Sequence, residues 1–225
     1  FALETARLTA RSHNTLPAPR HILSAVYEGA TTDLDTALRC ELAHFVACAA
    51  SPESHNIIRT AFFGVTDARK LKRRPAGVPA REIRRLGVVG PAPVVEPLIA
   101  LAVKAGVPVS WSGGTADDLA DAWTPLVTLA DAPAAVADCD AVVTAPGAQA
   151  PAAGAALQLG LWQDGGAAQR PLSLRPSGGT HALVEVVCAG TVRTEDLAGA
   201  MDLVRRLGRV PLVVRAAAGS YVERV

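Results

Sequence analysis

After residue 84 the sequence alternates short apolar runs with helix-like segments, and this alternation constrains the fold more than any other feature. The runs are apolar at nearly every position rather than at every second one, as in strands of a parallel sheet covered on both faces. They are LGVV (86–89), VPVSW (107–111), LVTL (126–129), DAVVTA (140–145), ALQLGLW (156–162), LVEVVCAG (183–190) and VPLVVR (210–215). Helices are expected at 94–105, near 116–122, at 132–137 and from Thr194 to Gly208. The pattern predicts an α/β fold with a doubly wound, Rossmann-like parallel sheet.

The first seventy residues follow a helical period instead. In LDTALRCELAHFVACAA the apolar residues recur every three or four positions, which places one apolar stripe along a helix. That stripe consists of Leu34, Leu38, Leu42, Phe45, Val46 and Ala49, and we expect it to be packed against other side chains. Thr32 or Asp33 is the expected N-cap of this helix, and Ser51, followed by Pro52, is the expected start of the next. Two or three short helices therefore precede the first strand.

A basic stretch rich in proline and glycine, RKLKRRPAGVPAR (69–81), separates these helices from the α/β pattern and is the best candidate boundary. We therefore divide the chain into a helical part (1–68), a basic linker (69–83) and an α/β domain (84–225). The cluster RKLKRR is interpreted as a solvated linker, with a site for a specific anionic partner as the alternative. Because 22 basic residues nearly balance 21 acidic ones, general binding to nucleic acid or to a membrane surface is not indicated.

The four cysteines are widely spaced, without a C-x-x-C pair or a histidine at ligand spacing. They are Cys40, Cys48, Cys139 and Cys188. Neither a metal site nor a disulfide framework is predicted, and we expect reduced core thiols. No run reaches the ~18 apolar residues of a membrane span and the first residues do not have the layout of a signal peptide, so we expect a cytoplasmic protein. The chain opens at Phe1 on helix-like sequence, which suggests a fragment of something longer.

The segment RRLGVVGPAPVV (84–95) stands where a dinucleotide-binding fold carries G-x-G-x-x-G. Its three glycine positions hold Gly90, Ala92 and Val95, and the prolines at 91 and 93 have no N–H to donate. The second strand of such folds ends in an acidic residue that binds the ribose, whereas here Ser112 and Gly113 fall near that point. A serine there, with a nearby arginine, would suit the 2′-phosphate of NADP, and this variant stays open. The segment is interpreted as a retained turn that no longer grips a dinucleotide well.

The order of these pieces resembles the α subunit of the multifunctional fatty-acid β-oxidation enzyme. In that family an enoyl-CoA hydratase domain of the crotonase type is joined by a linker to an L-3-hydroxyacyl-CoA dehydrogenase. The phrase SPES…I…FF…DARK is the most specific part of the resemblance. IRRLGVVGPAPVVEPLIALAVKAGVPV is similar to the first β-α-β unit of the dehydrogenase, and ADAPAAVADCDAVVTA to the strand at its substrate cleft. The resemblance implies that 1–68 are the helical end of the hydratase domain with a linker helix, and that 84–225 are an NAD-binding-type domain.

The family's dehydrogenase uses a histidine as general acid-base, followed about a dozen residues later by a glutamate that orients it. Glu185 matches this glutamate, and the histidine position falls at or beside Ser173. His181 is only four residues before Glu185, so we do not expect it to substitute. A serine cannot supply this proton transfer, because its pKa lies far above 7. Without a histidine, the expected partner of Glu185 is a donor such as Thr180 or Arg175.

The candidate site is therefore Glu185 as an orienting carboxylate without its histidine, and Gly90, Ala92 and Ser112 as a vestigial cofactor site. The resemblance implies part of a β-oxidation enzyme that is inactive as a dehydrogenase and retained as a scaffold. The alternative is an active NAD(P)-dependent 3-hydroxyacyl-CoA dehydrogenase with an atypical cofactor site. No cofactor is expected, or NAD if the site functions. The partners implied are acyl-CoA in the parent enzyme, a thiolase β subunit and further copies in an oligomer.

Overall fold

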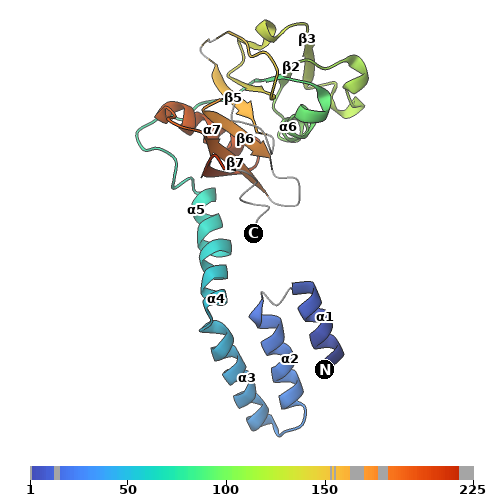
Figure 1. Cartoon of the computed structure of the whole chain (residues 1–225), viewed down its shortest axis with the longest axis vertical. Helices are drawn as coiled ribbons and strands as arrows, with labels where there is room; N and C mark the ends of the chain where they lie inside the picture. The colour runs from blue at the N-terminus through green and yellow to red at the C-terminus, as the bar shows by residue number, and fades with distance from the viewer. Residues whose placement is uncertain are drawn as a thin grey trace. The chain divides into compact units, whose positions relative to one another are not determined.

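A computed structural model of the chain describes residues 2–12, 16–152, 154, 156–162, 170–176 and 182–217 (Figure 1). The chain divides into two compact units, Phe1–Asp67 and Ala68–Val225. Among the described residues, no helix is long and apolar enough to cross a membrane.

The first unit is helical throughout its described part. Its elements are α1 (Ala2–Ser12), α2 (Pro17–Gly29), α3 (Leu34–Ala49), α4 (Pro52–Ile57), a π-helical segment (Ile58–Gly64) and the start of α5 (Val65–Arg69). Asp33 caps α3 by accepting the backbone N–H of Thr36 at 3.0 Å, and Ser51 caps α4 by accepting that of Ser54 at 3.1 Å. Both predicted caps are confirmed.

The apolar stripe of α3 does not form a core. Leu34 is 73% exposed and Phe45 is 67% exposed, and the described helices α2 to α5 contain no buried residue. The helices α2 and α3 lie side by side and share a polar link, in which His44 contacts Glu28 and His21, each at 3.1 Å. The expectation of a packed stripe was wrong, because periodicity shows which face of a helix is apolar but not whether anything covers it.

The second unit is built on one eight-stranded sheet with the order β3-β2-β1-β4-β5-β6-β7-β8. The strands are β1 (Leu86–Val89), β2 (Val109–Ser112), β3 (Val127–Ala130), β4 (Ala141–Thr144), β5 (Leu157–Leu161), β6 (Leu172–Pro176), β7 (Leu183–Cys188) and β8 (Val210–Arg215). All neighbouring strands are parallel except β6 and β7, which are antiparallel. The predicted α/β, Rossmann-like class is confirmed.

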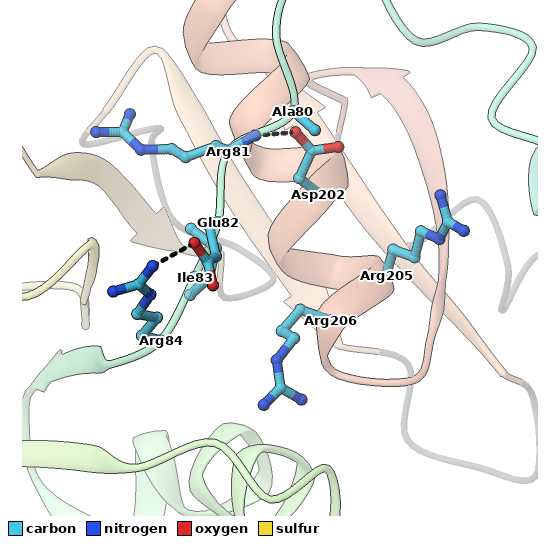
Figure 2. A pocket seen from close by; sticks show the side chains of 8 residues that line it. All are labelled: Ala80, Arg81, Glu82, Ile83, Arg84, Asp202, Arg205 and Arg206. Atoms are coloured by element: carbon cyan, nitrogen blue, oxygen red, sulfur yellow. Dashed lines mark hydrogen bonds and ion pairs between the residues drawn. The ribbon is translucent and has the colours of Figure 1, made fainter.

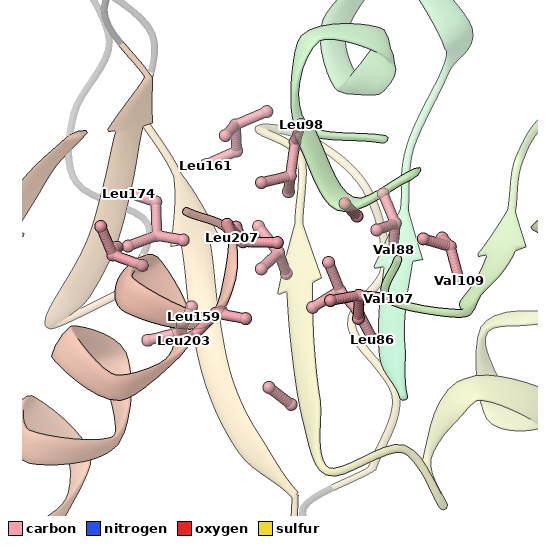
Figure 3. Close-up of a cluster of buried hydrophobic side chains, with 14 of the residues drawn as sticks. Leu86, Val88, Leu98, Val107, Val109, Leu159, Leu161, Leu174, Leu203 and Leu207 are labelled. Carbon is pink, nitrogen blue, oxygen red and sulfur yellow. The ribbon is translucent and has the colours of Figure 1, made fainter. Parts of the chain in front are cut away.

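Two helices, α6 (Ala92–Lys104) and α7 (Thr194–Arg206), pack with the sheet into the main core. Figure 3 shows this core, where Leu98 of α6 and Leu203 of α7 meet apolar side chains of the strands. A smaller cluster on the other face contains Val89 and Val142, covered by a 3₁₀ turn at Pro133–Val136. The predicted helices at 132–137 and near 116–122 are short 3₁₀ turns, Pro133–Val136, Ala116–Asp118 and Asp121–Trp123. Runs this short, beside Pro125 and Pro133, cannot complete an α-helix.

The basic stretch between the helices and β1 is attached to the second unit. Arg74 binds Asp202 of α7 through two contacts of 2.8 Å and donates to the carbonyl oxygens of Val78 and Pro79. The backbone N–H of Arg81 adds a third hydrogen bond to Asp202, at 2.9 Å. Residues 74–81 therefore follow the surface of α7 before the chain enters β1.

Candidate functional site

The turn from β1 into α6 depends on glycine at position 90. Gly90 has φ +148°, and a Cβ there would lie 2.4 Å from the Cβ of Ala145 in the chain after β4. Its N–H donates to the carbonyl oxygen of Ser112, at the end of β2, at 2.9 Å. The backbone therefore runs in close contact with both neighbouring strands, as expected at the start of a doubly wound sheet.

The N-terminus of α6 offers few amide donors. Phosphate groups bind at such a turn through unpaired backbone N–H groups at the first positions of the helix. Pro91, the N-cap, and Pro93 have no N–H, and the N–H of Val94 turns back to the carbonyl oxygen of Pro91 at 3.1 Å. Because the Gly90 N–H is held by Ser112, only the amide of Ala92 remains among positions 90–94. These residues do not fit a dinucleotide diphosphate.

Trp111, in β2, is hydrogen-bonded to the same turn. Its side chain is fully buried, and the indole N–H donates to the carbonyl oxygen of Gly90 at 2.9 Å. Gly113 has φ +101°, and a Cβ on it would lie 2.9 Å from the same carbonyl oxygen. A Cβ on Gly114 would lie 2.4 Å from the indole ring. The chain after β2 is thus folded against the turn and the tryptophan.

The predicted cofactor residues come together at this edge of the sheet. Gly90 and Ser112 are joined by the backbone hydrogen bond, Ala92 begins α6, and Ser112 is buried at 4% exposure. The structure brings the three positions close, as a dinucleotide fold requires. The Gly90 N–H, however, is used within the turn, in the hydrogen bond to Ser112.

Glu185 lies on β7 directly opposite Arg175 on β6. The Arg175 guanidinium donates to the Glu185 carboxylate at 2.7 Å, and the two side chains are 7% and 1% exposed. The guanidinium also lies 5.0 Å from the ring of Trp162, a cation–π distance. Arg175, one of the two donors predicted from the sequence, is therefore the partner of Glu185. In place of the histidine that the resemblance implies, the Glu185 carboxylate is thus paired with an arginine.

Ser173 is not the residue opposite Glu185 in the strand pairing. It lies opposite Val187, and its Oγ sits against β5, 2.6 Å from where a Cβ on Gly160 would be. Its side chain faces the same side of the sheet as Arg175, since the two are separated by one residue on a strand. Thr180 and His181 lie outside the described residues.

Further polar groups lie on this face, on β4 and along β5. Register and alternation place Gln158 and Trp162 on the face that carries Arg175. Thr144 Oγ1, both amide atoms of Gln158 and Trp162 Nε1 are buried without a hydrogen-bond partner among the residues that the structure describes. Buried polar atoms are nearly always paired, so these groups would suit a small polar molecule or waters. The described residues contain no group of three acidic, histidine or cysteine side chains that could hold a metal ion.

Two site residues, Trp111 and Trp162, were missed from the sequence. Trp111 was treated only as part of a strand, and a tryptophan between two serines beside a glycine pair is the signal that could have marked it. Trp162 was placed at the end of a strand without a role, and Arg175 was named only as one donor among two. Its position opposite Glu185 depends on the register of β6, which was not predicted as a strand.

No protein-family model matches this sequence, and a comparison with curated proteins found no significant match. Solved structures are similar in fold. FadB2 of M. tuberculosis matches with a TM-score of 0.50 and 15% identity over 63% of this chain and 67% of that chain. The dehydrogenase part of multifunctional enzyme 1 from C. elegans matches with a TM-score of 0.50 and 9% identity over 63% of this chain and 44% of that chain. The 3-hydroxybutyryl-CoA dehydrogenase of E. coli matches with a TM-score of 0.50 and 14% identity over 64% of this chain and 40% of that chain. At these identities the likeness shows the fold alone, that of 3-hydroxyacyl-CoA dehydrogenases. The chain spans less than half the length of the latter two.

Proposed function

We propose that residues 84–225 are a 3-hydroxyacyl-CoA dehydrogenase-like domain of a β-oxidation-type enzyme that binds no nicotinamide cofactor and serves as a scaffold. The observation that carries this proposal is the single amide, that of Ala92, left for an anion at positions 90–94. A hydrogen bond to a charged group contributes about 1.5 to 3 kcal/mol. Losing two such donors lowers affinity about a hundredfold or more.

The pair of Arg175 and Glu185 supports the same proposal from the chemical side. The carboxylate that would orient a histidine is instead neutralised by a buried guanidinium at 2.7 Å. General acid-base help contributes roughly two to four orders of magnitude in rate, and an arginine beside the carboxylate does not replace the histidine that would supply it. Cofactor binding and proton transfer are thus both weakened, by changes at different strands.

The first unit extends the proposal to the parent protein. We propose that residues 1–68 are the helical end of a crotonase-type domain with its linker helix, as the phrase SPES…I…FF…DARK indicates. Acyl-CoA would then be the substrate of the parent enzyme, and a thiolase-type subunit the partner that the scaffold holds. Loss of thiolase co-purification on deletion of residues 84–225 from the full-length protein would support the scaffold role.

The proposal is tested by titrating NADH and NADPH into the chain and following tryptophan fluorescence, since Trp111 contacts the turn directly. We expect no saturable binding at micromolar concentrations and no oxidation of a 3-hydroxyacyl-CoA. Micromolar binding together with turnover would overturn the proposal and establish the active alternative.

A gain-of-function variant tests the physical reason. The double substitution Pro91→Ala and Pro93→Ala restores two N–H groups at the turn, and we expect weak but measurable NADH binding. Pro97→Ala is the matched control, because Pro97 lies inside α6, away from the turn. If the double variant binds no better than the control, donor loss is not the reason.

A further inference from the structure

A hollow in the α/β unit lies between the chain that enters β1 and the last turns of α7 (Figure 2). It has a volume of about 590 Å³ and is lined by Arg81, Glu82, Arg84, Asp202, Arg205 and Arg206, with Ala80 and Ile83. Residues 80–84 precede β1, so the hollow lies at the amino ends of the parallel strands. Cofactors of doubly wound folds bind at the carboxyl ends, so this hollow is separate from the site described above.

Both acidic groups in the hollow are already engaged. Asp202 accepts hydrogen bonds from Arg74 at 2.8 Å and from the backbone of Arg81 at 2.9 Å. Glu82 is paired with Arg84 at 2.7 Å. Four arginines against two acids leave an excess of two positive charges in the lining.

The two arginines of α7 in the lining are not paired with an acidic residue that the structure describes. The Arg205 side chain makes no hydrogen bond or ion pair with any residue that the structure describes, whereas its backbone carbonyl oxygen accepts the N–H of Gly208. Arg206 donates to the carbonyl oxygens of Ala105 and Gly106 at 2.8 and 3.3 Å, which fixes its guanidinium beside the hollow. Figure 2 shows Arg84 on the side of the entering chain and Arg205 and Arg206 on the side of the helix.

The charge of the surrounding sequence points the same way. Segments 69–85 and 205–209 hold eleven of the chain's 22 lysines and arginines and one acidic residue. Segment 105–169, by contrast, holds seven acidic residues and no lysine or arginine. Asp140 of segment 105–169 accepts the backbone N–H groups of Arg84 and Arg85, so the excess of positive charge there comes from the side chains of the first two segments.

An ordinary explanation exists for part of this pattern. Basic residues in the last turn of a helix offset its dipole and stabilise it by about 0.3 to 1 kcal/mol each. That accounts for Arg205 and Arg206, and for Arg69 at the end of α5, but not for the basic residues of 72–85, which lie outside the helices. Compensation of the helix dipole also does not explain why a hollow is present. At about 590 Å³ the hollow falls within the range of roughly 300 to 1,000 Å³ that is usual for small-molecule pockets.

We propose that this hollow is a binding site for a diphosphate group. Guanidinium groups bind phosphate oxygens in pairs and at fixed geometry, and four of them belong to the lining. The diphosphate could be free or carried by a nucleoside. This proposal is independent of the scaffold function, because it concerns the opposite edge of the sheet.

The first test is calorimetric titration of the chain with inorganic pyrophosphate at low ionic strength, with backbone amide shifts followed by NMR. We expect saturable binding with shifts centred on residues 80–84 and 202–206. Arg205→Gln should weaken binding about five- to tenfold. Arg193→Gln is the matched control, because it removes the same charge from an exposed arginine at the other end of α7. Equal weakening by both variants would mean attraction by overall charge and would overturn the proposal.

The second test is a gain of affinity. Glu82→Gln releases Arg84 from its ion pair and should tighten pyrophosphate binding severalfold. Glu195→Gln makes the same change of charge in the first turn of α7 and should leave the affinity unchanged. No difference between these two variants contradicts a site in the hollow. ADP serves as the second ligand: tighter binding than pyrophosphate assigns the diphosphate to a nucleotide, and equal binding assigns it to the free anion.

Discussion

The two units use similar apolar content in opposite ways. Every buried apolar residue that the structure describes lies between Ile83 and Leu207, in the second unit. Every large apolar side chain that the structure describes as exposed lies between Leu3 and Phe63, in the first unit. The first unit has helices with well-formed caps and an apolar stripe, yet no interior. The difference shows that local helix signals and the presence of a core are separate properties, because helices gain most of their stability from a surface to pack on.

The largest expected effect concerns the interior of the second unit. Glu185→Leu leaves the buried Arg175 without its carboxylate, and we expect a loss of about 3 to 5 kcal/mol in the free energy of unfolding. Urea denaturation followed by tryptophan fluorescence measures this unit alone, since Trp111, Trp123 and Trp162 all belong to it. The double substitution Arg175→Met with Glu185→Leu should recover most of the loss. A single substitution as mild as the double one would show that the pair is not buried as described.

A pair of leucine truncations compares the units directly. Leu174→Ala, at a fully buried position of the second unit, should destabilise it by about 2 to 5 kcal/mol. Leu38→Ala, at a position of the first unit that is 54% exposed, should change the unfolding free energy by less than about 0.5 kcal/mol. Tryptophan fluorescence measures the unfolding of the Leu174 variant, and far-ultraviolet circular dichroism measures that of the Leu38 variant. A large cost at Leu38 would mean that the stripe of α3 is covered after all.

Caps should matter more in the first unit than apolar side chains. Ser51→Ala removes the acceptor for the Ser54 N–H and should cost about 1 kcal/mol of helix stability. Ser51→Asp keeps an acceptor at the same place and is the control. Loss of helicity in thermal melts, monitored by circular dichroism, checks the difference. If the alanine variant melts like the original chain, packing rather than capping holds α4.

The smallest effect is a pH dependence of α3. Hydrogen bonds from the Thr36 side chain and backbone to Asp33 lower the pKa of this carboxyl below its ordinary value. The stabilisation is therefore fully present above the ordinary aspartate pKa and is lost as the pH falls through the lowered one. Helicity should decrease slightly over that acidic range. Asp33→Asn keeps a capping side chain that does not titrate, and its helicity should lack this step.

The sequence predicted the sheet well where apolar runs end at strong turn residues. The predicted β1 and β8 agree with the observed strands, because Gly90 closes the first and Gly208 precedes the second. Strand β6 escaped prediction because its residues Ser173 and Arg175 face one side and interrupt the apolar run. The sequence named Arg175 and Thr180 as possible partners of Glu185, and the choice of Arg175 follows from strand pairing across ten residues, which no local pattern contains. The loss of amide donors at the turn, by contrast, could be predicted, because proline has no backbone N–H in any fold.

The hydrogen bonds from Arg74 to Asp202 indicate that the folded α/β unit includes residues before Arg84. A shortened chain starting at Arg84, where the strand pattern starts, would discard the guanidinium that holds Asp202 and the Arg81 amide beside it. The carboxylate, 11% exposed in the intact chain, would then be left at the surface of α7 without its main partners. Trypsin acting at exposed Lys70 or Arg73 would instead release a fragment that keeps Arg74, and that fragment is the natural one to isolate.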